Sequence, residues 1–274
     1  PVLLNADLEK LKHLPAHGFE YAVIRSVFLA DGKPGRLEES INRICAEAEK
    51  AVRAGKKIIV ISDRKIGEEY APIPSMLAIG AVHHSLVEKR IRTQTGLLVE
   101  AGDVWEVHHF ATIIGYGASA INPYMVNEII HDQVNQGFIK GVKADYAIVN
   151  YNKAIAKGIV KIMNKIGIST LHSYRPAQIF EILGLNKTFT SKYFPYTPSR
   201  IEGIGLMEVE KEVKKRFQKA FPNSKVANLL PLEIGGIYRW RRGGEKHMFN
   251  PTTIAKLQQA VRLNSPESYK EYSN

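Results

Sequence analysis

The sequence contains a single cysteine, Cys45, among its 274 residues. One thiol cannot form an intrachain disulfide, and it cannot hold an iron–sulfur cluster by itself. This scarcity favours a reducing compartment, so we expect a cytoplasmic protein. Cys45 follows Ile44 on the apolar side of a predicted helix, which favours a core position over a reactive thiol.

Long apolar runs are also missing. The longest, such as residues 58–61, fall far short of the roughly 20 residues that a membrane-spanning helix needs, so we expect no membrane association. The sequence begins at Pro1 with no charged-then-apolar leader. We therefore expect either a processed protein or a piece of a longer chain.

Acidic residues are scarce in the second half of the chain. Residues 1–150 carry 17 Lys and Arg against 18 Asp and Glu, a net charge of −1. Residues 151–274 carry 21 against 9, a net charge of +12. A basic half of this kind suits either nucleic acid or an acidic partner surface.

Short apolar strands alternate with amphipathic helices over residues 1–185. Strands are predicted at residues 21–28, 57–62, 97–99, 119–121 and 169–172. Helices are predicted at residues 5–14, 36–54, 75–89, 104–114, 124–134, 148–166 and 177–183. Asn5 and Asp103 are expected to cap the helices that follow them. This alternation predicts an α/β domain with a mainly parallel sheet of about five strands, either open or an incomplete barrel.

The composition changes after Gly184. Residues 186–205 read as a long loop rich in aromatic residues, and residues 206–221 as a charged amphipathic helix. A hairpin turning at Gly243–Gly244 is predicted over residues 236–248, and a last helix over residues 251–263. We therefore divide the chain into an α/β core, residues 1–185, and a C-terminal extension, residues 186–274.

Polar residues follow the predicted strands, at the edge where parallel α/β folds usually bind ligands. The site hypothesis is a cleft lined by Asp63, Arg64, Glu100, Asn122, Ser173 and Arg175. The same side chains could instead cap the following helices, and this is the favoured interpretation. Spacing alone identifies no Ser-His-Asp order and no close carboxylate pair, so no catalytic residue is assigned.

Two histidine pairs and one glycine motif give weaker evidence for a functional site than the strand-end residues do. The side chains of His83–His84 and His108–His109 point about 100° apart on a helix, and no HExxH accompanies them, so no metal site is predicted. Gly115–Tyr116–Gly117 precedes a predicted strand, whereas a dinucleotide fingerprint follows one. No cofactor-binding residue is therefore assigned.

Arginines and a tryptophan alternate in RWRRGG, residues 239–244. Nucleic-acid binders can use such a pattern. On a hairpin, however, Tyr238 and Trp240 would share one face and pack, while Arg239 and Arg241 would face solvent or a partner. Nucleic acid is therefore the weaker hypothesis for the basic half.

Four blocks of this sequence resemble one family in its own order. RLEESINRICAEAEKAVRAGKKIIVISDR (36–64), a block from residue 72 to 125 beginning PIPSMLAIGAVHHSLVEKR, and KGIVKIMNKIGISTLHSYRPAQIFEILGL (157–185) resemble the central domain of the glutamate synthase large subunit. GGIYRWRRGGEKHMFNPTTIAKLQQAVR (235–262) resembles the segment joining that domain to the flavin domain. One departure is Pro176, where the family's pattern has glycine; proline suits a first helical turn and affects only the local loop.

The resemblance implies one part of a multidomain oxidoreductase that makes glutamate from glutamine and 2-oxoglutarate. In that family an amidotransferase domain with an N-terminal cysteine releases ammonia. The ammonia travels through a tunnel to an FMN-binding domain, where 2-oxoglutarate is aminated and reduced with electrons passed through a [3Fe-4S] cluster. The central domain connects the two sites, and its α/β fold is similar to a reduced flavin barrel.

The resemblance thus implies a non-catalytic domain that connects two sites and shapes the ammonia route. The chain is expected to hold no cofactor, with FMN and [3Fe-4S] belonging to the complete enzyme. Its expected partners are the glutamine amidotransferase domain and the FMN-binding domain of the same parent chain. Two alternatives stay open: a self-sufficient α/β enzyme that uses the strand-end residues, and a nucleic-acid binder that uses the basic half.

Overall fold

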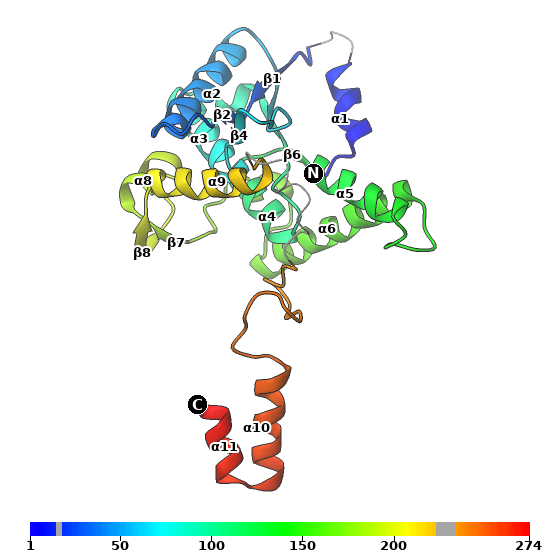
Figure 1. Ribbon diagram of the computed structural model, residues 1–274. Helices are drawn as coiled ribbons and strands as arrows, with labels where there is room; N and C mark the ends of the chain where they lie inside the picture. The colour runs from blue at the N-terminus through cyan, green and yellow to red at the C-terminus, as the bar shows by residue number, and fades with distance from the viewer. Residues whose placement is uncertain (15–17, 223–233) are drawn as a thin grey trace. The chain divides into compact units, whose positions relative to one another are not determined.

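A set of short apolar strands forms the sheet at the centre of the fold. The computed structural model describes residues 1–14, 18–222 and 234–274 (Figure 1). Its main sheet is parallel throughout, with strand order β1-β3-β5-β6. The strands are β1 (Tyr21–Arg25), β3 (Ile58–Ser62), β5 (Gly96–Glu100) and β6 (Ala120–Asn122). The predicted α/β class and mainly parallel sheet are confirmed, with four strands in place of about five and no closed barrel among the described residues.

Helices cover this sheet unequally. One face packs against α2 (Arg36–Arg53), α3 (Ser75–Glu88) and α4 (Val107–Gly115). The predicted stripe of α2 is 0–3% exposed throughout: Leu37, Ile41, Ile44, Ala48 and Val52. On the other face, Leu8 of α1 (Asn5–Lys12) packs on Val60 and Leu98. Burial of such stripes, more than intrinsic propensity, stabilises helices of this length.

Two helix caps differ from the sequence prediction. Asn5 is the first residue of α1 rather than its cap. Asp103 does not cap α4, because this helix begins later in the chain and its N-cap residue is Glu106. Its Oδ2 instead accepts a hydrogen bond, at 3.0 Å, from the backbone N–H of Ser75, the first residue of α3. Pro74 precedes Ser75 and offers no side-chain acceptor, so α3 takes its cap from a distant loop.

The other elements up to residue 166 flank this core. They are β2 (Val27–Leu29), paired antiparallel with β4 (Tyr70–Pro72), then η1 (Arg92–Gln94), α5 (Tyr124–Asn135) and α6 (Ala144–Ile166). The 23-residue helix α6 buries Ile155, Ile159 and Met163. The long helix predicted from its isoleucine stripe is therefore confirmed.

The secondary structure predicted between residues 169 and 205 is wrong. The expected fifth strand is a short helix, α7 (Leu171–Tyr174), and the expected helix 177–183 gives way to a strand, β7 (Ile182–Leu185). The expected loop 186–205 contains α8 (Lys187–Tyr193) and β8 (Ser199–Ile204), and β8 pairs in parallel with β7.

Aromatic contacts across the chain explain this failure. Phe189, Tyr193 and Phe194 are only 3–5% exposed. The ring of Phe194 occupies the space that a Cβ on Gly80 of α3 would take, and Phe180 lies in the same way against Gly115 of α4. Aromatic side chains of residues 180–194 therefore pack on helices about 65 to 115 residues earlier, which local patterns do not reveal.

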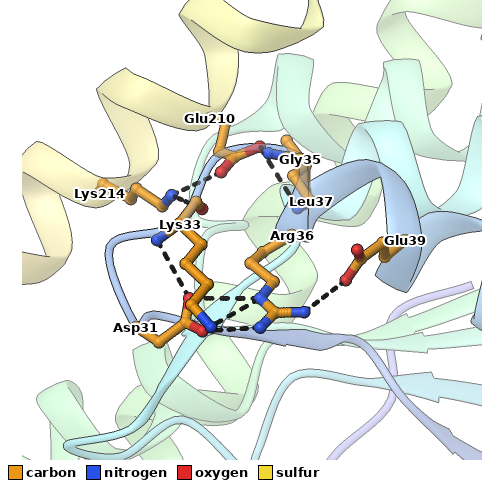
Figure 2. Close-up of polar contacts among 8 residues, drawn as sticks. All are labelled: Asp31, Lys33, Gly35, Arg36, Leu37, Glu39, Glu210 and Lys214. Carbon is orange, nitrogen blue, oxygen red and sulfur yellow. Dashed lines mark hydrogen bonds and ion pairs between the residues drawn. The ribbon is translucent and has the colours of Figure 1, made fainter.

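Glu210 fastens the predicted charged helix, α9 (Leu206–Ala220), to the start of α2 (Figure 2). The side chain is 4% exposed, and its Oε2 accepts hydrogen bonds from the backbone N–H groups of Gly35 at 3.1 Å and Leu37 at 3.4 Å. Its Oε1 lies 2.5 Å from Nζ of Lys214, which also donates to the backbone oxygen of Lys33 at 2.6 Å. A carboxylate at a helix N-terminus is favoured by the free N–H groups and by the helix dipole.

The chain divides into two compact units, Pro1–Phe221 and Pro222–Asn274. In the second, α10 (Pro251–Leu263) and α11 (Pro266–Ser273) pack on each other. The predicted hairpin over residues 236–248 is wrong, because these residues form a closed loop without strands. Glu245 N–H donates to Gly235 O at 2.8 Å, and His247 Nε2 lies 2.5 Å from Gly236 O.

Among the described residues, no helix combines the length and the apolar character needed to cross a membrane.

We predict that Glu210→Ala lowers the free energy of unfolding by about 2–3 kcal/mol, because Lys214 and two backbone N–H groups lose their partner. Glu212→Ala, on the same helix, removes only an exposed ion pair with Lys215 and should change the free energy of unfolding by less than about 0.5 kcal/mol. Urea unfolding of both variants measures the difference. Equal losses would show that Glu210 does not fasten α9.

Candidate functional site

Polar side chains gather at the carboxyl edge of the main sheet. Glu100, the last residue of β5, is 3% exposed. Its Oε2 accepts a hydrogen bond from Ser62 Oγ at 2.6 Å, and its Oε1 accepts one from Arg64 Nε at 2.5 Å. Nζ of Lys12, from α1, lies 3.7 Å from the same Oε1. The buried negative charge is therefore balanced by two cations.

Asp63 lies beside this group and is 2% exposed. Its Oδ1 and Oδ2 lie 3.1 and 2.9 Å from the backbone N–H of Gly102, which donates to them, and the Tyr124 hydroxyl also hydrogen-bonds to the carboxylate. Burial raises the pKa of Asp63 from its ordinary 3.8 to about 7, and the nearby carboxylates of Asp103 and Glu100 add to the rise. The hydrogen bonds from Gly102 and Tyr124 oppose it.

Three asparagines tie the N-terminal segment to β6 and α5. Asn122 Nδ2 donates to Leu3 O and to Asn5 Oδ1, both at 3.0 Å, and Asn127 Nδ2 donates to Asn5 Oδ1 at 2.9 Å. The Oδ1 atoms of Asn122 and Asn127 are buried and accept no hydrogen bond from the described residues. Buried acceptors of this kind suit bound water.

The structure places Ser173 and Arg175 away from these residues. Neither follows a strand: Ser173 lies in α7, where its N–H donates to the Thr170 cap at 3.2 Å. Arg175 lies near Arg92, whose pKa falls to about 10, first through burial and then through the charge of Arg175. Arg92 binds backbone oxygens that precede β5 and β6, at the amino edge of the sheet. The six predicted residues therefore separate into a group of four and a pair.

A second buried network at the amino edge is built around His83. Its Nδ1 accepts a hydrogen bond from Arg92 Nε at 2.9 Å, while the other guanidinium nitrogens donate to Thr95 O and Gly117 O at 2.7 Å each. Burial, then the charge of Arg92, lowers the pKa of His83 to about 3, so the imidazole stays neutral. This histidine packs and hydrogen-bonds, as expected for an ordinary core position.

Lys12 and Tyr124 are among the partners at the carboxyl edge that sequence reasoning missed. Tyr124 comes two residues after Asn122, so its place at the strand end was a usable signal; the guanidinium carbon of Arg64 lies 4.3 Å from its ring centroid. Lys12 offered no signal, because only the packing of α1 against the sheet brings it to Glu100.

The polar side chains at this edge hold separate elements of the fold together. Asp63, Glu100 and Asn122 each bind backbone or side chains from another element. Among residues 1–14, 18–222 and 234–274, no group of three or more His, Cys, Asp or Glu side chains could hold a metal ion.

A cavity of about 460 Å³ lies between α1, α5 and α6, lined by Asn5, Asn127 and His131 among others. A more apolar one of about 310 Å³ lies between α3, α4 and β7.

The chain is similar to known proteins along its whole length. The family described as "Glutamate synthase central domain" matches residues 1–186. The large chain of the NADPH glutamate synthase of Bacillus subtilis is 38% identical over 273 residues, which cover 100% of this chain and 17% of that one. The NADH glutamate synthase of Schizosaccharomyces pombe is 41% identical over 277 residues, covering 100% and 13%. The ferredoxin-dependent enzyme of Pyropia yezoensis is 37% identical over 262 residues, covering 92% and 17%.

Asp63→Asn tests the raised pKa of this residue. Because the fold disfavours the ionised form, the contribution of Asp63 to stability is complete below pH 3.8 and is lost as the pH rises to about 7. The free energy of unfolding of the variant, minus that of the native chain, should therefore increase from pH 4 to pH 8 by on the order of 3 kcal/mol. Urea unfolding at both pH values measures it, and a constant difference would contradict the raised pKa.

Proposed function

The chain belongs to the glutamate synthase central domain family, and from this premise we propose that it is the non-catalytic connecting domain of such an enzyme. The main support is the pattern of coverage. Relatives match 92–100% of this chain, yet the match takes up only 13–17% of their own length. The domain would keep an amidotransferase site and an FMN site in register and shape the ammonia route between them.

The same match occurs in relatives named for NADPH, NADH and ferredoxin. A domain shared by enzymes with three different electron donors suits a task common to all of them. Transfer of ammonia from glutamine to 2-oxoglutarate is such a task, whereas choice of donor is not. We therefore assign the domain to spacing and ammonia routing in a cytoplasmic enzyme.

The residues present do not fit a [3Fe-4S] cluster. Such a cluster takes several thiolates, and the chain has one cysteine, Cys45. Cys45 is a partly buried side chain packed against the main core, and burial raises the pKa of its thiol to about 11. A thiol of this kind is a poor ligand. The cluster is therefore assigned to other parts of the complete enzyme, and FMN is assigned to the FMN-binding domain that the family resemblance implies.

The first test uses this chain alone. We expect no glutamine hydrolysis, no glutamate formation from 2-oxoglutarate and no tightly bound flavin, because the reacting groups lie elsewhere. Enzyme assays and the absorption spectrum of the purified chain measure these properties. Turnover that disappears in Asp63→Asn would instead support an enzyme using the strand-end residues. Salt-dependent retention on DNA that disappears in Arg241→Glu would support a nucleic-acid binder.

The second test uses the complete glutamate synthase. If the domain sets the spacing of two reaction centres, loosening α9 by Glu210→Ala should uncouple them. The ratio of glutamine hydrolysed to 2-oxoglutarate consumed should then rise above one, because ammonia escapes before it is used. Glu212→Ala is the matched control and should leave the ratio unchanged. A Glu210→Ala enzyme that loses both activities equally would contradict the spacing role.

A further inference from the structure

The edge strand β1 is unusually open. It is the first strand in the order β1-β3-β5-β6, and residues 21–25 pair with β3 in a regular register without a bulge. Natural proteins normally protect such edges with proline, lysine or a bulge. The sequence of this strand, YAVIR, contains neither proline nor lysine.

The backbone groups of alternate residues point away from the sheet. Glu20 O accepts from the N–H groups of Lys57 and Ile58, and Ser26 N–H donates to Ser62 O, so the even-numbered residues face β3. By alternation, Tyr21, Val23 and Arg25 present their N–H and C=O groups outward. Among the described residues, Arg43 contacts this side of the strand at its end, where its Nη2 donates to Arg25 O and to Val27 O at 2.9 Å each.

The side chains of the same three residues lie on the uncovered part of the sheet face. Ala22 and Ile24 pack into the main core beneath α2. Tyr21 and Val23 point to the opposite face and are 36% and 45% exposed. Arg25 is exposed as well and forms no ion pair within the described chain. Apart from the Arg43 contact with Arg25 O, the edge thus combines outward backbone groups without a strand partner, the exposed side chains of Tyr21 and Val23, and the cation of Arg25.

We propose that β1 pairs antiparallel with β1 of a second copy of this chain, about a two-fold axis through Val23. In that register Val23 lies opposite its counterpart, and Tyr21 lies opposite Arg25 of the other copy. All three are outward-facing residues, so three hydrogen-bonded pairs form, with Arg25 O accepting through the lone pair that Arg43 does not use. Arg25 can then place its guanidinium on the Tyr21 ring, a favourable cation–π pair. The two sheets become one sheet of eight strands.

The pairing suits a second copy because the edge is self-complementary. A strand of one charge sign would repel its own copy, whereas this register brings no like charges opposite each other. The interface that this short edge can form is small compared with the roughly 800 Å² per partner of a standard interface. We therefore expect a dissociation constant in the micromolar range or weaker.

Sedimentation equilibrium of this chain, over a concentration series up to about 1 mM, tests the proposal. We expect a monomer–dimer equilibrium that Val23→Pro and Val23→Lys weaken at least about tenfold. Val23 N–H points outward, so proline removes no bond to β3. Val160→Lys, at a side chain 64% exposed on α6, is the matched control and should leave the dimer intact. Circular dichroism checks that each variant is folded.

A pair of charge variants tests the register. Tyr21→Glu places a carboxylate opposite Arg25 of the other copy, so the dimer should persist and become salt-sensitive. Tyr21→Lys places a like charge there and should weaken the dimer at least about tenfold. A chain that stays monomeric throughout, a dimer indifferent to Val23→Lys, or equal weakening by both Tyr21 variants would overturn the proposal.

Discussion

Among the residues that the structure describes, three carboxylates are buried almost completely, and each requires specific partners. Asp63, Glu100 and Glu210 are 2–4% exposed. A buried carboxylate is costly unless hydrogen bonds or cations replace the lost water. Here the partners come from other elements: a loop N–H for Asp63, cations from α1 and the β3 loop for Glu100, and the start of α2 for Glu210. Because each partner must be in place, these groups fix how the elements sit against one another.

Contacts of this kind between separate elements suit the connecting role proposed for the domain. The carboxyl edge of the sheet, where α/β enzymes commonly keep their reacting groups, is occupied here by bonds between β3, β5, β6 and the N-terminal segment. Glu210 similarly ties α9 to α2 through the contacts drawn in Figure 2. The polar residues that sequence reasoning singled out as a possible cleft thus hold elements together, which is what spacing two distant sites would demand.

Local patterns predicted the parts of the fold whose partners are near in sequence. The stripe of α2 and the long helix α6 follow from periodicity, because burial of one face imposes it, whereas β3 and β5 follow from continuous apolar runs that are buried on both faces. Four of the six strand-end residues also lie along one edge of the sheet, since the ends of parallel strands share an edge. Ser173 and Arg175 do not, because their assignment depended on a fifth strand that the chain does not form.

Other features depend on contacts that no local pattern contains. Asp103 was predicted to cap the helix that follows it, but the position of its loop beside Ser75 makes it the cap of α3 instead. Residues 186–205 form α8 and β8 because Phe189, Tyr193 and Phe194 find a surface, Gly80 included, more than 100 residues earlier.

The sequence by itself determined the fold class, the apolar core stripes and the family, since these depend on residue order and spacing alone. Tertiary structure decided which buried charge meets which partner. The free energy of a buried ion depends on distances between side chains that the chain brings together only when it folds.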